Sequence, residues 1–173
     1  MSLPLPSPHV TSLDSSKVTL FRSKLVDATR TMLFASSLLF GDEVGLFPLL
    51  RDAKLKGLTA ADPATQARVD VRYVQEWLVH MASSGVVLHD ASTQTFVLPA
   101  EHALVLTDES SAAFATGMIE FGVGSVMLHD KLMRLFRSGG GLPWNELDPR
   151  CSSGLRRWFR TNYDHLLVQE WIP

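Results

Sequence analysis

The chain has 173 residues, 46% of them hydrophobic and 20% charged, which suits one compact domain with a real core. A formal net charge of −2 excludes the strong basic excess that usually marks nucleic-acid or anionic-membrane binding. The single cysteine, Cys151, excludes an internal disulfide, and the simplest expectation is a cytoplasmic protein.

The N-terminal segment, residues 1–16, is rich in proline and serine and is predicted to be a disordered leader. It lacks the apolar run of a secretory signal, and no apolar stretch is long enough to span a bilayer, so no membrane partner is expected. A helix is predicted over Lys17–Phe40, amphipathic in its first half and apolar on most sides in its second. Such a helix is expected to pair across a two-fold axis, making a homodimer.

Gly41 is predicted to end that helix, and Asp42 to cap a short following one. From Gly57 to Leu98 the pattern changes to helix, turn, helix and hairpin. Thr59 or Asp62 is expected to cap the first of these helices, which Pro63 shortens.

Asp70 is predicted to cap the stronger second helix, which ends at Ser83–Gly85. Its apolar residues recur at helical spacing: Val71, Val74, Trp77, Leu78 and Met81. Two predicted strands, Val86–Leu88 and Thr95–Leu98, flank the polar turn Asp90–Gln94. The predicted fold is therefore mainly α, a winged helix-turn-helix with a small β-hairpin wing and flanking N- and C-terminal helices.

Beyond the wing, the sequence again predicts helices. A short one covers Ala100–Leu106, and a long glycine-dotted stretch covers Ser110–Arg137, with a break expected near Gly122–Gly124. Ser138–Gly141 ends that stretch. A last helix is predicted from about Ser152, with these apolar residues: Leu155, Trp158, Phe159, Tyr163, Leu166, Leu167 and Trp171.

Four separated blocks of sequence carry a resemblance to a known family. They are Val69–Leu78, Met81–Val87, Phe96–Ala103 and Phe136–Trp144, the last containing Gly-Gly-Gly-Leu-Pro-Trp. In this order they resemble the N-terminal domain of a group of class I S-adenosylmethionine-dependent methyltransferases, over about Leu20 to Pro173. The resemblance implies a winged-helix-like domain that forms a dimer and caps an active site.

The resemblance also divides the chain. It implies a winged-helix dimerisation domain over residues 17–107 and a helical cap or linker over residues 108–173, leading toward a Rossmann-like catalytic domain. The cofactor loop of that domain, of the Asp-x-Gly-x-Gly type, is not found here. The glycine cluster Gly139–Gly141 follows a predicted helix rather than a strand. We therefore expect a truncated chain or stand-alone remnant that is non-catalytic alone, with no catalytic or cofactor-binding residue.

The resemblance places part of a substrate pocket for a small-molecule acceptor in the long helical stretch and the glycine-rich loop. The candidates are Met118, Phe121, Met127 and Trp144. For the first three, ordinary core packing at helical spacing is the alternative. Glu101 and Glu120 are expected to be capping or solvated carboxylates.

A set of cations, Lys131, Arg134, Arg137, Arg156, Arg157 and Arg160, is expected to form a solvated face. If the two halves of this set lie side by side, the alternative is a site for an acidic substrate or for the catalytic domain.

A winged helix can also read DNA, so a transcriptional regulator is the alternative function. The second helix, however, offers Arg72, Gln75, Glu76 and His80, which together are about neutral, and the wing Asp90–Gln94 has no cation. Neutralising phosphates supplies most DNA affinity, so nucleic acid is not the expected partner. The six histidines show no metal-ligand spacing, and no metal site is expected.

Overall fold

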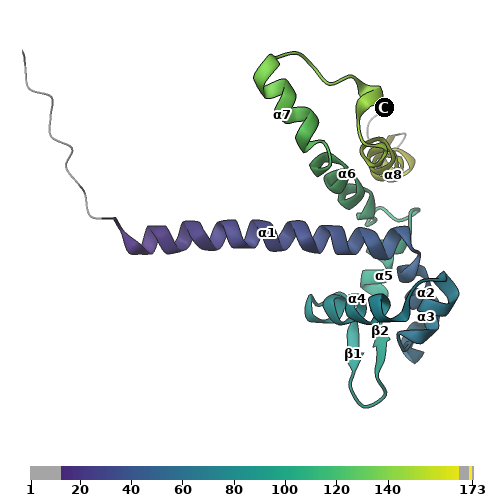
Figure 1. The fold of residues 1–173 in the computed structure, drawn as a ribbon. Coiled ribbons are helices and arrows are strands. Elements are labelled where there is room, and N and C mark those ends of the chain that lie inside the picture. The colour runs from purple at the N-terminus through teal and green to yellow at the C-terminus, as the bar shows by residue number, and fades with distance from the viewer. Residues whose placement is uncertain (1–12, 168–171, 173) are drawn as a thin grey trace, which may run out of the picture. The chain divides into compact units, whose positions relative to one another are not determined.

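The computed structural model describes residues 13–167 and 172, except the side chains of residues 161, 162, 165 and 166. This part of the chain is mainly helical, with one two-stranded antiparallel hairpin, as predicted (Figure 1). The helices are α1 (Ser15–Glu43), α2 (Leu46–Ala53), α3 (Ala61–Ala67), α4 (Val71–Ser83), α5 (Ala100–Thr107), α6 (Thr116–Val126), α7 (His129–Ser138) and α8 (Pro149–Leu166). The strands are β1 (Leu88–Asp90) and β2 (Thr95–Val97), and two 3-10 turns are η1 (Lys54–Lys56) and η2 (Trp144–Glu146).

The chain divides into two units, residues 1–32 and residues 33–173. Most of the predicted leader, the predicted Trp171 and the side chain of Leu166 lie outside the described residues. Helix α1 begins at Ser15, where the Asp14 carboxylate accepts from the backbone N–H of Ser16 at 3.0 Å.

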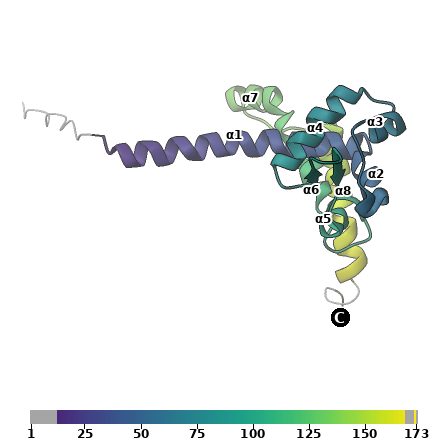
Figure 2. The same ribbon diagram turned by 90° about the horizontal axis from the view of Figure 1, so that it is seen from below.

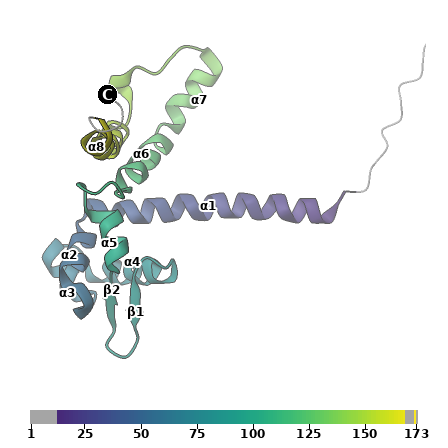
Figure 3. The same cartoon turned by 180° about the vertical axis from the view of Figure 1, so that it is seen from behind.

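The core of the second unit lies among α2, α4, α5 and the hairpin (Figure 3). Phe47, Leu78 and Met81 are fully buried in it. Trp77 closes one side, because its ring packs edge-on against Phe47 and its indole N–H donates to the Ser37 carbonyl at 2.8 Å. These contacts join the winged unit to the C-terminal end of α1.

The helix-turn-helix follows the predicted local signals. Asp70 caps α4, since its carboxylate accepts from the backbone N–H of Arg72 at 2.8 Å. Arg68 ends α3 in the left-handed region at φ 57°, a conformation that glycine adopts more easily. The exception is the cap predicted for α3 at Thr59 or Asp62, which was wrong, because Ala60 holds the cap position and no side chain bonds to the helix there. The hydroxyl of Thr59 instead donates to the Asp62 carboxylate at 2.7 Å, and Pro63 lies in the first turn, where its missing N–H costs little.

The hairpin is shorter than predicted. Its register pairs Leu88 with Val97 and Asp90 with Thr95, so the first strand starts two residues later than expected. Val86 and Val87 are instead buried behind the end of α4, where the backbone N–H of Val86 donates to the Met81 carbonyl at 2.8 Å.

The helix end predicted at Gly41 was wrong. α1 continues through Gly41 to Glu43, and the turn before α2 comes at Gly45, with φ 76°. Gly41 serves packing instead, because a Cβ there would lie 2.2 Å from the Trp77 ring. Asp42 is therefore not a cap; it lies in the last turn of α1 and binds an arginine described below.

The break predicted at Gly122–Gly124 was also misplaced. Ser110 to Ala115 forms turns, α6 runs unbroken through both glycines, and the break falls between Val126 and His129. Helices α6 and α8 lie side by side, and Figures 1 and 2 agree on this. A Cβ on Gly154 of α8 would lie 2.5 Å from the Gly117 carbonyl oxygen, so glycine is required for the two backbones to approach this closely. The last helix begins at Pro149, three residues before the predicted start, with Asp148 as its cap.

Candidate functional site

The N-terminal half of helix α1 presents an exposed apolar surface. Every residue from Leu13 through Leu33 is exposed. Apolar side chains there recur alternately three and four residues apart, the spacing of a coiled-coil seam. We call this set the α1 seam: Val18, Phe21, Leu25, Ala28 and Met32.

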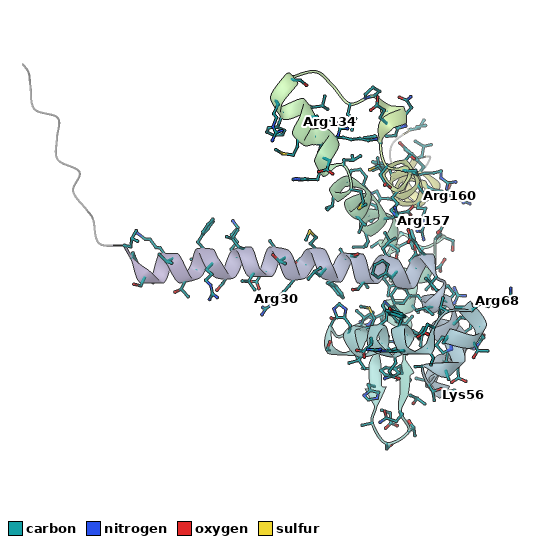
Figure 4. All side chains as sticks on the ribbon, in the orientation of Figure 1. Arg30, Lys56, Arg68, Arg134, Arg157 and Arg160 are labelled. Atoms are coloured by element: carbon teal, nitrogen blue, oxygen red, sulfur yellow. The ribbon has the colours of Figure 1, made fainter. Side chains whose placement is uncertain are left out.

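Exposure of such a face on a lone helix is unfavourable. In proteins, a helix draws most of its stability from packing against other elements, and the threonines of α1 are poor helix formers. Its salt bridges, such as Arg30 with Asp27 at 3.3 Å, are exposed and contribute little. Figure 4 shows Arg30 projecting from the helix. The α1 seam is therefore a candidate association surface.

An apolar hollow of about 370 Å³ lies at the junction of α1, α2 and α4. Phe40 and Val44 line one side and Val74 and Trp77 another, and both Phe40 and Val44 are exposed. Asp70 is the charged residue of its lining, and its carboxylate already caps α4. The hollow thus adds an uncovered apolar surface within the second unit.

A larger hollow, about 550 Å³, lies between α2, η1 and α5. Its apolar walls include Leu98 and Leu104. The Arg51 guanidinium at its edge is already engaged, because Nε donates to Asp52 at 2.8 Å and Nη1 to Thr107 at 3.2 Å. The Asp52 hydrogen bond raises the pKa of Arg51.

The helix that would enter a DNA groove carries little positive charge here. On α4, Arg72, Gln75 and Glu76 are exposed, while His80 is half-buried, edge-on to Phe34. In the wing, hydrogen bonds from Ser92 lower the pKa of Asp90 to about 2, so the wing tip is anionic at neutral pH. An anionic wing repels phosphates, and this face does not favour nucleic acid.

The four predicted pocket residues lie on two segments. Met118 and Phe121 are on α6, Met127 follows its last residue, and Trp144 opens η2. Phe121 is half-buried, whereas Met127 and Trp144 expose 63% and 65% of their surface. The two hollows above are lined by other residues, so a pocket made by these four stays a prediction.

The predicted cation set is divided by the fold. Arg157 of α8 turns inward, and its guanidinium donates to three carboxylates, each at 2.8 Å or less: Asp42, Glu109 and Glu120. It also lies 5.2 Å above the Phe114 ring. Figure 4 shows Arg157 beside α6, whereas Arg134 projects from α7. A single site combining the two halves of the set is therefore not formed around Arg157.

This cluster is the main feature that the sequence did not predict. Glu120 is 8% exposed and ion-paired, not the solvated or capping group expected. Burial disfavours the Arg157 charge, but hydrogen bonds to Asp42 and Glu120 outweigh it and raise the pKa of Arg157. Asp42 and Arg157 are 115 residues apart, so no local pattern signals their pairing.

The described residues also bear on metal binding and on membrane insertion. Among the described residues, no group of three or more histidines, cysteines or carboxylates is placed to hold a metal ion. Within the same ranges, no single helix is both long and apolar enough to cross a bilayer. By length and composition alone, α1 together with Leu46–Lys56 would qualify, but this pair is bent by 72°.

The fold and these surfaces define a winged helix-turn-helix domain followed by a closely packed helical pair. Residues 22–108 match the model of the Rv2258c-like winged HTH domain, and the chain belongs to this family. No curated protein matches the chain.

Among solved structures, the mitomycin 7-O-methyltransferase MmcR is similar to this chain, with a TM-score of 0.64 and 17% sequence identity. The match covers 87% of this chain and 46% of that one, so this chain spans about half the length of that enzyme. It falls on the N-terminal part of MmcR, which confirms the resemblance in fold to the N-terminal domain of a methyltransferase.

Proposed function

We propose that this chain is the dimerisation and substrate-cap part of a methyltransferase that uses S-adenosylmethionine. The uncovered α1 seam, in a domain whose fold matches the N-terminal part of an O-methyltransferase, is the observation that carries the proposal. A cap of this kind aligns an acceptor with the cofactor methyl group and excludes water, and alignment is the larger part of such catalysis. We place the protein in the cytoplasm, consistent with its buried, unpaired Cys151.

The partner proposed for the seam is a second copy of this chain. Phe21, Leu25 and Met32 are large and exposed on one helix face, and a second copy offers the same face by symmetry. Burial of such side chains contributes about 1.5–3 kcal/mol each when complete, which favours association over exposure to water.

The substrate-cap role is proposed for Met118, Phe121, Met127 and Trp144. Exposed methionine and aromatic side chains suit an apolar small-molecule acceptor, because methionine adapts its shape and tryptophan offers a large flat surface.

The glycine-rich loop after α7, within the described part of the chain, does not fit the cofactor itself. Gly139 and Gly140 have positive φ, but they follow α7 rather than a strand, and no helix starts directly after them to direct its N–H groups at a ligand. The proposal therefore expects no methyl transfer by the 173-residue chain. Titration calorimetry with S-adenosylmethionine should show no micromolar binding, and micromolar binding would contradict this part of the proposal.

Two matched variants test dimerisation. Leu25→Asp places a carboxylate in the seam, whereas Ser23→Asp places the same group on the opposite side of α1. Sedimentation equilibrium of the full chain should give twice the 19.1 kDa chain mass for the wild type and Ser23→Asp. Leu25→Asp should give a monomer. A wild-type monomer at high micromolar concentration, or equal behaviour of the two variants, would refute the seam as the dimer interface.

A further inference from the structure

We infer that two copies of α1 pair antiparallel along the α1 seam, with the two-fold axis beside Val26 and Asp27. The inference rests on the proposed dimerisation and adds its orientation and register. Side-chain size and charge along α1 each favour this arrangement independently.

The sizes of the seam side chains decide against a parallel pair. In a parallel, in-register pair each seam residue meets its own copy, so Phe21 would meet Phe21 and Ala28 would meet Ala28. The first layer would be crowded and the second would leave a void, and both defects are unfavourable.

The antiparallel register places unlike side chains together. Leu25 meets Ala28 of the second copy, and Phe21 meets Met32 of the second copy. The sequence numbers in each pair sum to the same value, so one register satisfies both layers, each formed twice by symmetry. A large side chain opposite alanine fills the space more evenly, which favours this register.

The charges that flank the seam favour the same orientation. Lys17, Arg22 and Lys24 are exposed beside it, and Lys17 pairs with Asp14 at 3.6 Å. A parallel pair would place Lys17 next to Arg22 of the second copy on both sides of the interface, which is repulsive.

In the antiparallel register the flanking cations meet hydroxyls instead. Arg22 faces Thr29 of the second copy, and Lys24 faces Thr31 of the second copy. No two cations are then adjacent across the interface, so the basic N-terminal halves are kept apart.

Spin labels on one face of α1 distinguish the two orientations. Ser16→Cys and Ser23→Cys are near-isosteric changes on the side away from the seam, seven residues apart. At 1.5 Å per residue, the antiparallel register separates the two Ser16 labels by about 30 Å along the helix axis, and the two Ser23 labels by about 10 Å. A parallel pair gives nearly equal distances at the two sites. The native thiol of Cys151 is buried, so the unsubstituted chain treated with the same reagent is the labelling control.

A substitution within the α1 seam gives a second test, because it should change the dimer Kd in opposite directions for the two orientations. Ala28→Leu crowds Leu25 of the second copy in the antiparallel register and should raise the dimer Kd about tenfold. In a parallel pair the same change would fill the Ala28 void and lower the Kd. Ser23→Leu, on the outer side, adds the same side chain without entering the interface and should leave the Kd unchanged.

The possible results separate this inference from the proposal on which it rests. A dimer with the longer Ser16 distance and a weakened Ala28→Leu variant supports the antiparallel register. A dimer with equal distances, or with a tightened Ala28→Leu variant, overturns the register and leaves dimerisation standing. A monomer by sedimentation overturns both.

Discussion

Helices α1 and α8 are the two longest in the chain, and their surroundings differ. α8 packs on α6 through Gly154 and Gly117 and directs Arg157 into three carboxylates. α1 is exposed over its whole N-terminal half, with large apolar side chains in water. The chain therefore packs α8 against α6 itself, whereas the N-terminal half of α1 is exposed.

The two helices depend on different contacts. The close approach of α6 and α8 depends on the absence of side chains at a few glycines, so it tolerates little change. The order of α1 depends on protein concentration if a second copy covers the seam. Substitutions in the α6–α8 contact and in the α1 seam should therefore be detected by different measurements.

The largest loss of stability is expected from Gly154→Ala. Its Cβ would lie 2.5 Å from both the Gly117 carbonyl oxygen and the Phe121 backbone nitrogen, so the helices must separate. We expect a loss of about 3 kcal/mol in the free energy of unfolding, measured by urea denaturation. Gly122→Ala is the control, because nothing lies within 4 Å of its Cβ, and it should gain about 0.5–1 kcal/mol. Equal effects would mean that the α6–α8 contact is not tight.

A smaller loss is expected from Arg157→Met. The change leaves Asp42 and Glu120 close together without their counter-ion, and both side chains are largely buried. We expect about 2 kcal/mol, below the range for fully buried pairs, because the Arg157 side chain is 18% exposed. Adding Glu120→Gln should restore part of the loss.

The control for the arginine cluster is Arg150→Met. Arg150 pairs with Glu43 at 2.9 Å, but both side chains are about two-fifths exposed, so the change should cost under about 1 kcal/mol. A larger loss from Arg150→Met than from Arg157→Met would contradict the importance given to the buried cluster.

How far the sequence predicted the fold depended on the range of the interaction. The cap at Asp70 and the stripe from Val74 to Met81 are local, and both were read correctly. Gly41 and Gly124 were misread as breaks, because glycine here permits close approach of a side chain or a helix distant in sequence. The Arg157 cluster joins segments that only the fold brings together.

Prediction of the candidate site from the sequence was limited in the same way. The amphipathic pattern in the first half of α1 is visible in the sequence, whereas the exposure of its apolar side chains is known from the structure. The hollow lined by Phe40 and Trp77 depends on packing between distant segments. The four pocket residues came from a family resemblance, and in the fold they occupy α6, its end and η2.

A smaller loss than that from Arg157→Met is expected from Asp70→Ala, which removes the local cap of α4. Loss of the hydrogen bonds to the backbone N–H groups of Arg72 and Tyr73 should cost about 1 kcal/mol. Glu76→Ala, on the exposed side of α4, should stay within about 0.5 kcal/mol of the wild type. If both variants matched the wild type, α4 would be held by packing alone.

Hydrogen–deuterium exchange of the full chain at two protein concentrations tests the central contrast most directly. Backbone amides of α6 and α8 should be protected equally at nanomolar and high micromolar concentrations, because their contacts lie within one chain. Amides over residues 15–32 should exchange fast when dilute and become protected when concentrated. Protection of residues 15–32 that does not change with concentration would contradict the account.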